Sequence, residues 1–313
     1  MQAYIFVDLD DSFTLDKSVL DILLKDRTSN RNIIWATDDY SEFGDSFSAK
    51  SEIESYLFSG INIGVAVRPR TAKADDRQNG RTREKAEVFT PSWLCNEQNN
   101  LIDEQWFGRK SVFNKQINKV WQPVEGKITF PVVKGKTWKD YVDARRMEIT
   151  CGEAPYLVSR YDTVSGDNID LFRRIGLLDR KLRIVNENTV DKDEWYKWVE
   201  RAYQSIYGFE YQGDSLLIAR ANLLYTFVDN MRFKFEQTPN VAELGKIATI
   251  ISWNLWQMDG MTLAIPLSDA QDINTQISLF DFSDDKVGRT LCRINDWRSK
   301  KIVEFASIVE GKK

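Results

Sequence analysis

The 313-residue sequence contains no histidine and only three cysteines. Without histidine, the chain has neither a Ser-His-Asp nor a Cys-His catalytic arrangement, and it has no histidine-ligated metal site. Cys95, Cys151 and Cys292 lie far apart and lack the close spacing of a zinc knuckle. We therefore expect free thiols, a reducing cytoplasmic setting and no bound metal.

The sequence also lacks a long apolar run and a strong charge of one sign. No apolar stretch approaches the ~20 residues that span a bilayer, and the first residues, "MQAYIFVDLDDSF", lack the basic start of a signal peptide. Hydrophobic residues make up 42% of the chain, and its net charge is −4. These values indicate a globular protein without a membrane partner, in which any contact with nucleic acid comes from a local basic patch.

Composition along the chain divides it into three parts. Residues 1–67 hold three short apolar runs, "AYIFVDL", "RNIIWAT" and "INIGVAV", and are predicted to form a small α/β region. Residues 68–86 form a basic loop before a main domain at 87–313. In this loop, residues 68–85 hold seven Lys or Arg against three Asp or Glu. A flexible connector and a phosphate-contacting loop both fit this run, and the candidates for DNA contact are Arg68, Arg70, Arg77, Arg81 and Arg83.

From residue 147 onwards, short apolar runs alternate with helical patterns. The strand-like "MEIT" leads into a glycine turn, and "EWYKWVERAYQSI" has the 3–4 spacing of an amphipathic helix. "YGFE" is typical of a strand, and two further helical segments follow it before an Asp-Gly turn at 259–260. This alternation predicts a parallel α/β sheet, in which ligands bind beyond the carboxyl ends of the strands.

Four motifs in this part of the chain resemble those of S-adenosylmethionine-dependent adenine-N6 DNA methyltransferases, as found in restriction–modification systems. "EVFTP" (87–91) is similar to the family's N-terminal motif, and "EITCGEAPYLV" (148–158) to its cofactor loop. "IYGFEYQGDSLLIARANL" (206–223) is similar to the ribose-binding strand with its following helix, and "WQMDG" (256–260) to the next motif. The resemblance covers residues 87–260 and implies a Rossmann-like methyltransferase sheet that binds S-adenosyl-L-methionine.

The resemblance also implies roles for single residues. Glu210 would hold the ribose hydroxyls and Asp259 the adenine amino group, and charge-assisted hydrogen bonds make a carboxylate well suited to a diol. Gly152 would let the backbone approach the cofactor closely. Thr90 suits the N-cap of a helix whose first residue is Pro91. The other implied cofactor-binding residues are Phe89, Thr90, Pro91, Glu148, Cys151, Glu153 and Tyr156.

The family's catalytic motif, Asn or Asp followed by Pro-Pro and an aromatic residue, is missing because the sequence has no Pro-Pro pair. In the family this motif holds the target amino group and stacks on the flipped base. Asn295 and Trp297 in "CRINDWRSK" are the remaining candidates for these catalytic roles. We therefore expect a sheet cut short at its C-terminal end. The expected partners are DNA and a second protein that supplies catalytic or target-recognition parts.

Two other functions stay open. A methyltransferase-like chain without the base-holding motif also fits a catalytically inactive sensor, a decoy or an anti-restriction protein. In addition, "YIFVDLDDSFTL" (4–15) resembles the first motif of haloacid-dehalogenase-type phosphatases, in which Asp8 would be the nucleophile and Asp10 the acid/base. "ATDDY" (36–40) follows too soon after it to supply that family's last motif.

Overall fold

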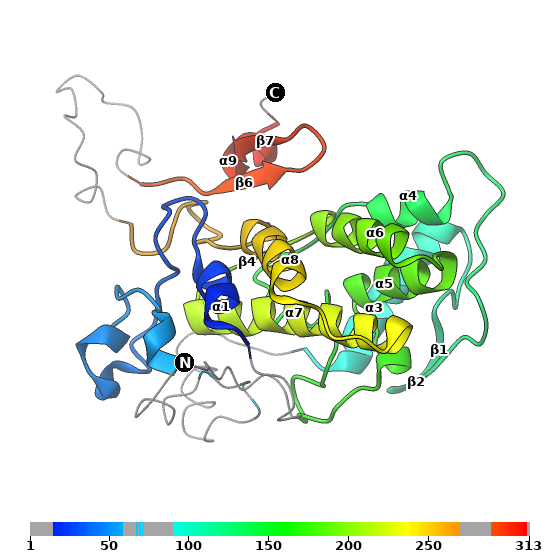
Figure 1. Cartoon of the computed structure of the whole chain (residues 1–313), viewed down its shortest axis with the longest axis horizontal. Helices are drawn as coiled ribbons and strands as arrows, with labels where there is room; N and C mark the ends of the chain where they lie inside the picture. The colour runs from blue at the N-terminus through cyan, green and yellow to red at the C-terminus, as the bar shows by residue number, and fades with distance from the viewer. Residues whose placement is uncertain are drawn as a thin grey trace.

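The computed structural model describes residues 15–58, 67, 69, 71, 90–268 and 289–311, and these residues form a mixed α/β fold (Figure 1). The helices are α1 (Lys17–Leu24), α3 (Ser92–Phe107), α4 (Trp138–Asp143), α5 (Leu177–Asn188), α6 (Lys192–Gln204), α7 (Gly213–Phe235), α8 (Val241–Asn254) and α9 (Phe305–Val309). Short 3-10 turns are η1 (Ser41–Phe43), η2 (Asp45–Phe47), η3 (Ser55–Phe58) and η6 (Leu171–Arg173). The strands are β1 (Asn114–Ile117), β2 (Val120–Pro123), β3 (Arg146–Glu148), β4 (Ile206–Glu210), β5 (Leu255–Gln257), β6 (Arg293–Asp296) and β7 (Lys301–Glu304).

Strands β3, β4 and β5 form a parallel sheet in that order. Glu148 pairs with Gly208, and Glu210 pairs with Gln257, so the three carboxyl ends meet at one edge. Apolar residues follow one another without interruption in β4 because both faces of this strand are buried. The predicted α/β class and the predicted parallel strands are confirmed, whereas the finer Rossmann-like assignment stays a prediction.

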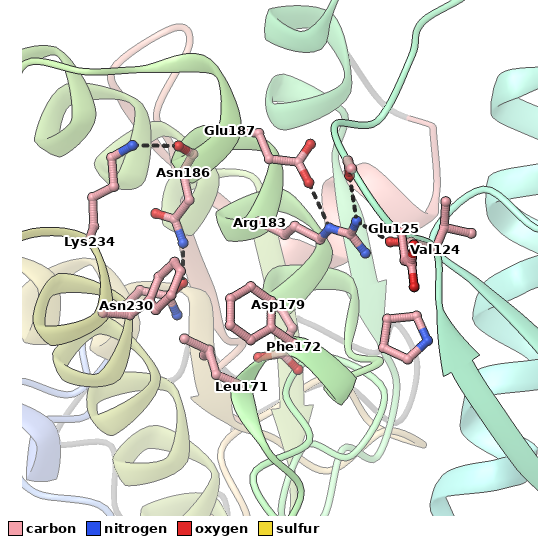
Figure 2. A pocket seen from close by; sticks show the side chains of 13 residues that line it. Val124, Glu125, Leu171, Phe172, Asp179, Arg183, Asn186, Glu187, Asn230 and Lys234 are labelled. Atoms are coloured by element: carbon pink, nitrogen blue, oxygen red, sulfur yellow. Dashed lines mark hydrogen bonds and ion pairs between the residues drawn. The ribbon is translucent and has the colours of Figure 1, made fainter.

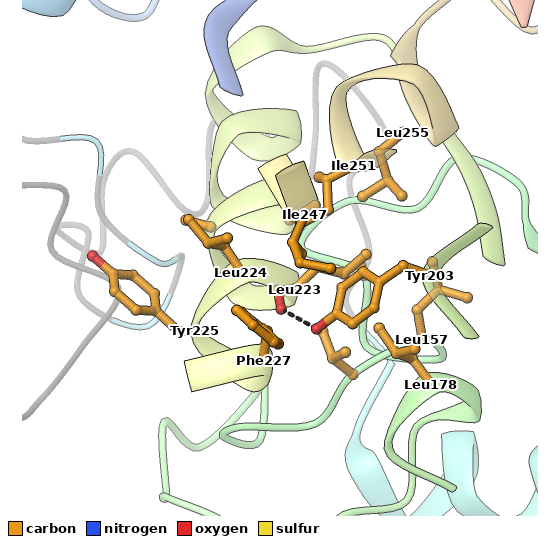
Figure 3. Close-up of a cluster of buried hydrophobic side chains, with 14 of the residues drawn as sticks. Leu157, Leu178, Tyr203, Leu223, Leu224, Tyr225, Phe227, Ile247, Ile251 and Leu255 are labelled. Carbon is orange, nitrogen blue, oxygen red and sulfur yellow. Dashed lines mark hydrogen bonds between the residues drawn. The ribbon is translucent and has the colours of Figure 1, made fainter. Parts of the chain in front are cut away.

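Helix α7 is the centre of the molecule, and its apolar residues surround its axis because other elements cover it on several sides. Figure 3 shows part of this core, where the Tyr203 hydroxyl donates a hydrogen bond to the Leu223 carbonyl at 2.7 Å. Arg220 on the same helix donates to the carbonyls of Leu23 and Leu255, which ties α1 and β5 to α7. Among the described helices, none has the length and apolar character needed to cross a membrane.

The N-terminal segment packs on this core and contains less strand than its sequence predicts. In residues 15–58 the structure has α1, the turns η1 to η3 and isolated bridges such as that between Ile34 and Glu52, but no strand. The run "RNIIWAT" is therefore not a strand: its backbone is held by the Gln257 side chain, which accepts from the Ile34 amide and donates to the Ile34 carbonyl. The other two predicted strands of this region fall almost wholly outside the described residues.

The face of the sheet opposite α7 and α8 is covered by β6, β7 and α9, which stand over β4 in Figure 1. Phe209 and Trp256 point from the sheet into this second cluster, where both rings contact the ring of Phe305. Neighbouring residues Ile206 and Leu255 belong to the main core instead. This alternation gives the sheet two buried faces. A ligand can therefore be held at the ends of its strands rather than on a face.

Candidate functional site

The loop after β3 is closed by the carboxylate at the end of that strand. Glu148 is buried, and its two oxygens accept hydrogen bonds from the amides of Tyr156 (3.3 Å) and Leu157 (3.2 Å). Burial raises the pKa of this carboxyl well above its ordinary value, and the nearby charge of Glu210 raises it further, against the lowering effect of the two amides. Glu148 therefore shapes the loop from inside rather than facing a ligand.

Within this loop the backbone turns sharply at three places. Thr150, Gly152 and Ala154 have φ values of +47°, +52° and +65°, in the left-handed region that favours glycine. This conformation directs the Gly152 amide at the Glu210 carboxylate, where the nitrogen–oxygen distance is 2.8 Å. The glycine loop and the acid, 58 positions apart in the sequence, thus meet at the carboxyl edge of the sheet.

Glu210 also holds the turn that follows its own strand. Its second oxygen accepts from the amides of Tyr211 (2.9 Å) and Gln212 (3.1 Å), the residues that lead into α7. Glu210 is half-buried as a residue, and its carboxylate holds two loops together. A carboxylate has about four lone-pair directions, and it can accept ligand hydroxyls in addition to backbone amides or in exchange for them.

Asp259 lies beside Glu210 at the end of the neighbouring strand. The Met258 amide donates to the Glu210 carbonyl at 3.0 Å, which places Asp259 one residue beyond that contact. One oxygen of Asp259 accepts from the Met261 amide at 2.8 Å and fixes the Asp-Gly turn. Partial burial raises the pKa of the Tyr211 hydroxyl, and the negative charge of Asp259 adds to this shift. The Tyr211 hydroxyl is therefore close enough to Asp259 for the negative charge to affect its pKa.

Gln212 is a candidate that sequence reasoning missed. It is 7% exposed, and no described residue pairs with its Oε1 atom. Buried polar atoms are almost always paired, so this acceptor at the carboxyl edge is a candidate for a ligand donor. The only signal in the sequence is that Gln212 follows the acid Glu210 by two positions, and Tyr211 between them is an aromatic residue suited to stacking on a base.

The described part of the predicted N-terminal motif, Thr90 and Pro91, leads into α3, and α3 contacts the cofactor loop. The Asn99 side chain donates to the Tyr156 carbonyl at 3.0 Å, and the Cys95 thiol donates to the Thr90 carbonyl. The expected cap by Thr90 is wrong, however. Pro91 occupies the N-cap position of α3, and the Asp162 carboxylate accepts from the Ser92 amide at 2.7 Å in place of a local cap.

Two residues of the predicted cofactor loop point into the protein. Glu153 is buried and accepts a hydrogen bond from the Tyr161 hydroxyl at 2.6 Å, while Asn222 donates to its carbonyl. Cys151 is buried as well, and its amide donates to the Phe209 carbonyl at 2.8 Å. Burial raises the pKa of the Cys151 thiol well above its ordinary value. The side chains of Glu153 and Cys151 therefore stabilise the loop and do not face a ligand.

Asn295 and Trp297 are also withdrawn, because they lie away from the carboxyl edge. Strand β6 begins next to the Gln257 carbonyl, which accepts from the Cys292 thiol, and runs across the sheet face in the opposite direction. At its far end the Trp297 ring donates to Asn254, whose own amide donates to the carbonyl of Ile206, the first residue of β4. Trp297 therefore stands at the amino end of the sheet, about 16 Å along the strand from Cys292.

Several predicted residues lie outside the described part of the chain. They are Phe89, the five arginines of the basic loop, and Asp8 and Asp10 of the phosphatase-like motif. Within the described ranges, no group of three or more Cys, Asp or Glu side chains is arranged to hold a metal ion.

No protein-family profile matches the chain, and no curated protein or solved structure matches it either.

Proposed function

We propose that the chain binds S-adenosyl-L-methionine at the carboxyl edge of β3, β4 and β5. It would act as the cofactor-binding subunit of an adenine-N6 DNA methyltransferase-like system of restriction–modification or related defence. The observation that carries the proposal is the contact between the Gly152 amide and the Glu210 carboxylate. This contact joins the two motifs that the resemblance assigns to the same ligand.

The donor and acceptor chemistry of the edge suits this cofactor. Its ribose hydroxyls, adenine amino group and ammonium are hydrogen-bond donors, and the edge offers acceptors: the half-buried carboxylates of Glu210 and Asp259, and the unpaired Oε1 atom of Gln212. The ring of Tyr211 offers an apolar face for adenine. When bound, the cofactor supplies a methyl group on a positively charged sulfonium, which an acidic edge favours.

The chain's own residues do not complete the methyl-transfer reaction in this proposal. The 313 residues contain no Pro-Pro pair, and Trp297 stands at the opposite end of the sheet. Preorganised acceptors for the target amino group, which usually make the largest contribution to catalysis, would come from a partner protein. The basic loop with Arg68, Arg70, Arg77, Arg81 and Arg83 would contact DNA phosphates, and binding would then weaken steeply with salt.

Calorimetric titration of S-adenosyl-L-methionine tests the cofactor site. Loss of the carboxylate in Glu210→Gln leaves ligand hydroxyls poorly paired, which costs about 1–3 kcal/mol, or roughly 5- to 150-fold in affinity. The matched control is Glu104→Gln, on the outer part of α3 beside Lys110. Thermal unfolding of both variants verifies that they fold. Absence of binding by the unmodified chain, or equal affinity of the two variants, would contradict the proposal.

A tritiated-methyl transfer assay on mixed-sequence DNA separates the subunit from its alternatives. The chain is assayed alone and together with the proteins encoded beside its gene. We expect transfer only in the presence of a neighbouring protein. Robust transfer by the chain alone would contradict the subunit role and indicate a complete, divergent methyltransferase. Cofactor binding without transfer in either case would instead indicate a sensor or decoy.

A further inference from the structure

A cavity of about 620 Å³ opens on the helical side of the molecule, far from the carboxyl edge (Figure 2). It lies between η6, α5, α7 and the segment after β2, and its volume falls within the ~300–1,000 Å³ of ordinary ligand sites. Asn230 on α7 lines it, whereas Gly213 at the start of that helix adjoins the edge. Asn230 and Gly213 are seventeen positions apart on the helix, which corresponds to about 25 Å. The cavity is therefore separate from the carboxyl edge.

The mouth of the cavity carries an aromatic pair. Phe172 from η6 and Phe233 from α7 are 60% and 46% exposed, and their ring centroids lie 4.9 Å apart at an interplanar angle of 90°. Leu171 and Val124 add aliphatic walls. Exposed aromatic rings at the opening of an apolar cavity favour a flat, apolar-faced ligand, because stacking on either ring buries area without ordering long side chains.

The depth of the cavity holds a polar atom without a partner. Asp179 is 7% exposed, and its Oδ2 atom accepts from the amides of Ser159 (2.8 Å) and Gly176 (3.0 Å). Its Oδ1 atom is buried and unpaired. Asp179 is among the residues that line the cavity. The wall therefore holds one acceptor that no described residue satisfies.

The cations that line the wall each donate hydrogen bonds to neighbouring groups of the protein. Arg183 donates to Glu187 at 2.7 Å and to the Val124 carbonyl at 2.7 Å, and Lys234 donates to the Asn186 carbonyl at 2.7 Å, as Figure 2 shows in part. These cations hold the wall together. They do not form the cluster of unengaged donors that a phosphate or another polyanion requires.

We propose that this cavity binds a planar nitrogen heterocycle of the nucleobase class that carries an N–H donor. The donor would meet Asp179 Oδ1, and one flat face of the ligand would stack on Phe172 or Phe233. Adenine is a simple molecule of this kind, because its amino group is an N–H donor on a flat ring. This site is independent of the proposed cofactor edge.

Titrations with adenine and with caffeine, followed by saturation-transfer NMR and calorimetry, test the proposal. Caffeine has a purine ring system but no N–H donor, so we expect it to bind the unmodified chain about tenfold more weakly than adenine. In Asp179→Asn, the amide oxygen must take over the contacts with Ser159 and Gly176, which turns the NH₂ group towards the cavity. The preference for adenine should then be lost.

Three further variants make the result decisive. Phe172→Ala should weaken both ligands, whereas Phe43→Ala, at another half-exposed phenylalanine, should weaken neither. Glu210→Gln should leave adenine binding unchanged, which separates this cavity from the cofactor edge. Far-UV circular dichroism and thermal unfolding verify the fold of each variant. The proposal is overturned if adenine does not bind, if adenine and caffeine bind equally, or if Glu210→Gln abolishes adenine binding while Phe172→Ala retains it.

Discussion

The two ends of the parallel sheet differ in how completely their polar groups are paired. At the amino end, the buried ammonium of Lys181 donates to the Val142 carbonyl at 3.0 Å, to the Ala144 carbonyl and to the Ser205 hydroxyl. All three of its hydrogens are used. At the carboxyl end, Gln212 keeps a buried acceptor with which no described residue pairs.

This difference separates a scaffold from a candidate site. A buried polar group whose hydrogen bonds are all made joins elements together, and its loss exposes unpaired partners. A buried acceptor that stays unpaired already costs free energy in the folded chain, and a ligand donor can recover that cost. The amino end should therefore respond to mutation through stability, and the carboxyl end through ligand affinity.

The largest effect is expected at the amino end, for Lys181→Met. Removal of the ammonium leaves the Ala144 carbonyl unpaired in the interior, and we expect a loss of about 3 kcal/mol in the free energy of unfolding. The matched control is Lys192→Met in the first turn of α6, where an exposed ion pair with Glu243 should contribute less than about 1 kcal/mol. Urea unfolding measures both. Equal losses in the two variants would remove the distinction between the ends.

An intermediate effect is expected for Glu148→Gln, and it depends on pH. The pKa of Glu148 is raised in the folded protein, so the folded state binds this proton more tightly than the unfolded state does. The stabilisation is complete below the ordinary glutamate pKa, about 4.3, and is lost as pH rises towards the folded pKa. A neutral glutamine does not titrate. As pH rises through that window, the free energy of unfolding of Glu148→Gln should therefore increase relative to that of the unmodified chain, by up to about 1.4 kcal/mol per pH unit.

The measurement is urea unfolding of both proteins at a series of pH values. Other titrating groups cancel in the difference between the two curves, which makes the unmodified chain its own control. A constant difference across all pH values would show that Glu148 ionises as readily in the folded chain as in the unfolded one.

Local patterns in the sequence account for much of this fold. The 3–4 spacing of Trp195 and Val199 predicts α6, and the apolar run that ends at Glu210 predicts β4, because both signals depend only on neighbouring positions. The contact between Gly152 and Glu210 also follows, since parallel strands bring their carboxyl ends together.

The parts that the sequence does not predict depend on polar side chains that meet across long separations. The Gln257 side chain pairs with the Ile34 backbone in place of a neighbouring strand, although the two residues are 223 positions apart. No periodicity in the sequence predicts that contact. Trp297 is held at the amino end by Asn254, although its local sequence resembles a base-holding turn. The unpaired acceptor of Gln212 is equally hidden, because pairing is a property of the packed chain rather than of any segment.

The smallest effect, and the sharpest test of the comparison, is expected for Gln212→Leu. The Oε1 atom of Gln212 has no partner among the described residues, so an apolar side chain of similar size should leave the free energy of unfolding within about 1 kcal/mol of the original or raise it. Affinity for S-adenosyl-L-methionine should fall about three- to tenfold, the value of one neutral hydrogen bond. Urea unfolding and calorimetry on the same samples measure the two quantities. A stability loss as large as that of Lys181→Met, with affinity unchanged, would place Gln212 in the scaffold and remove it from the site.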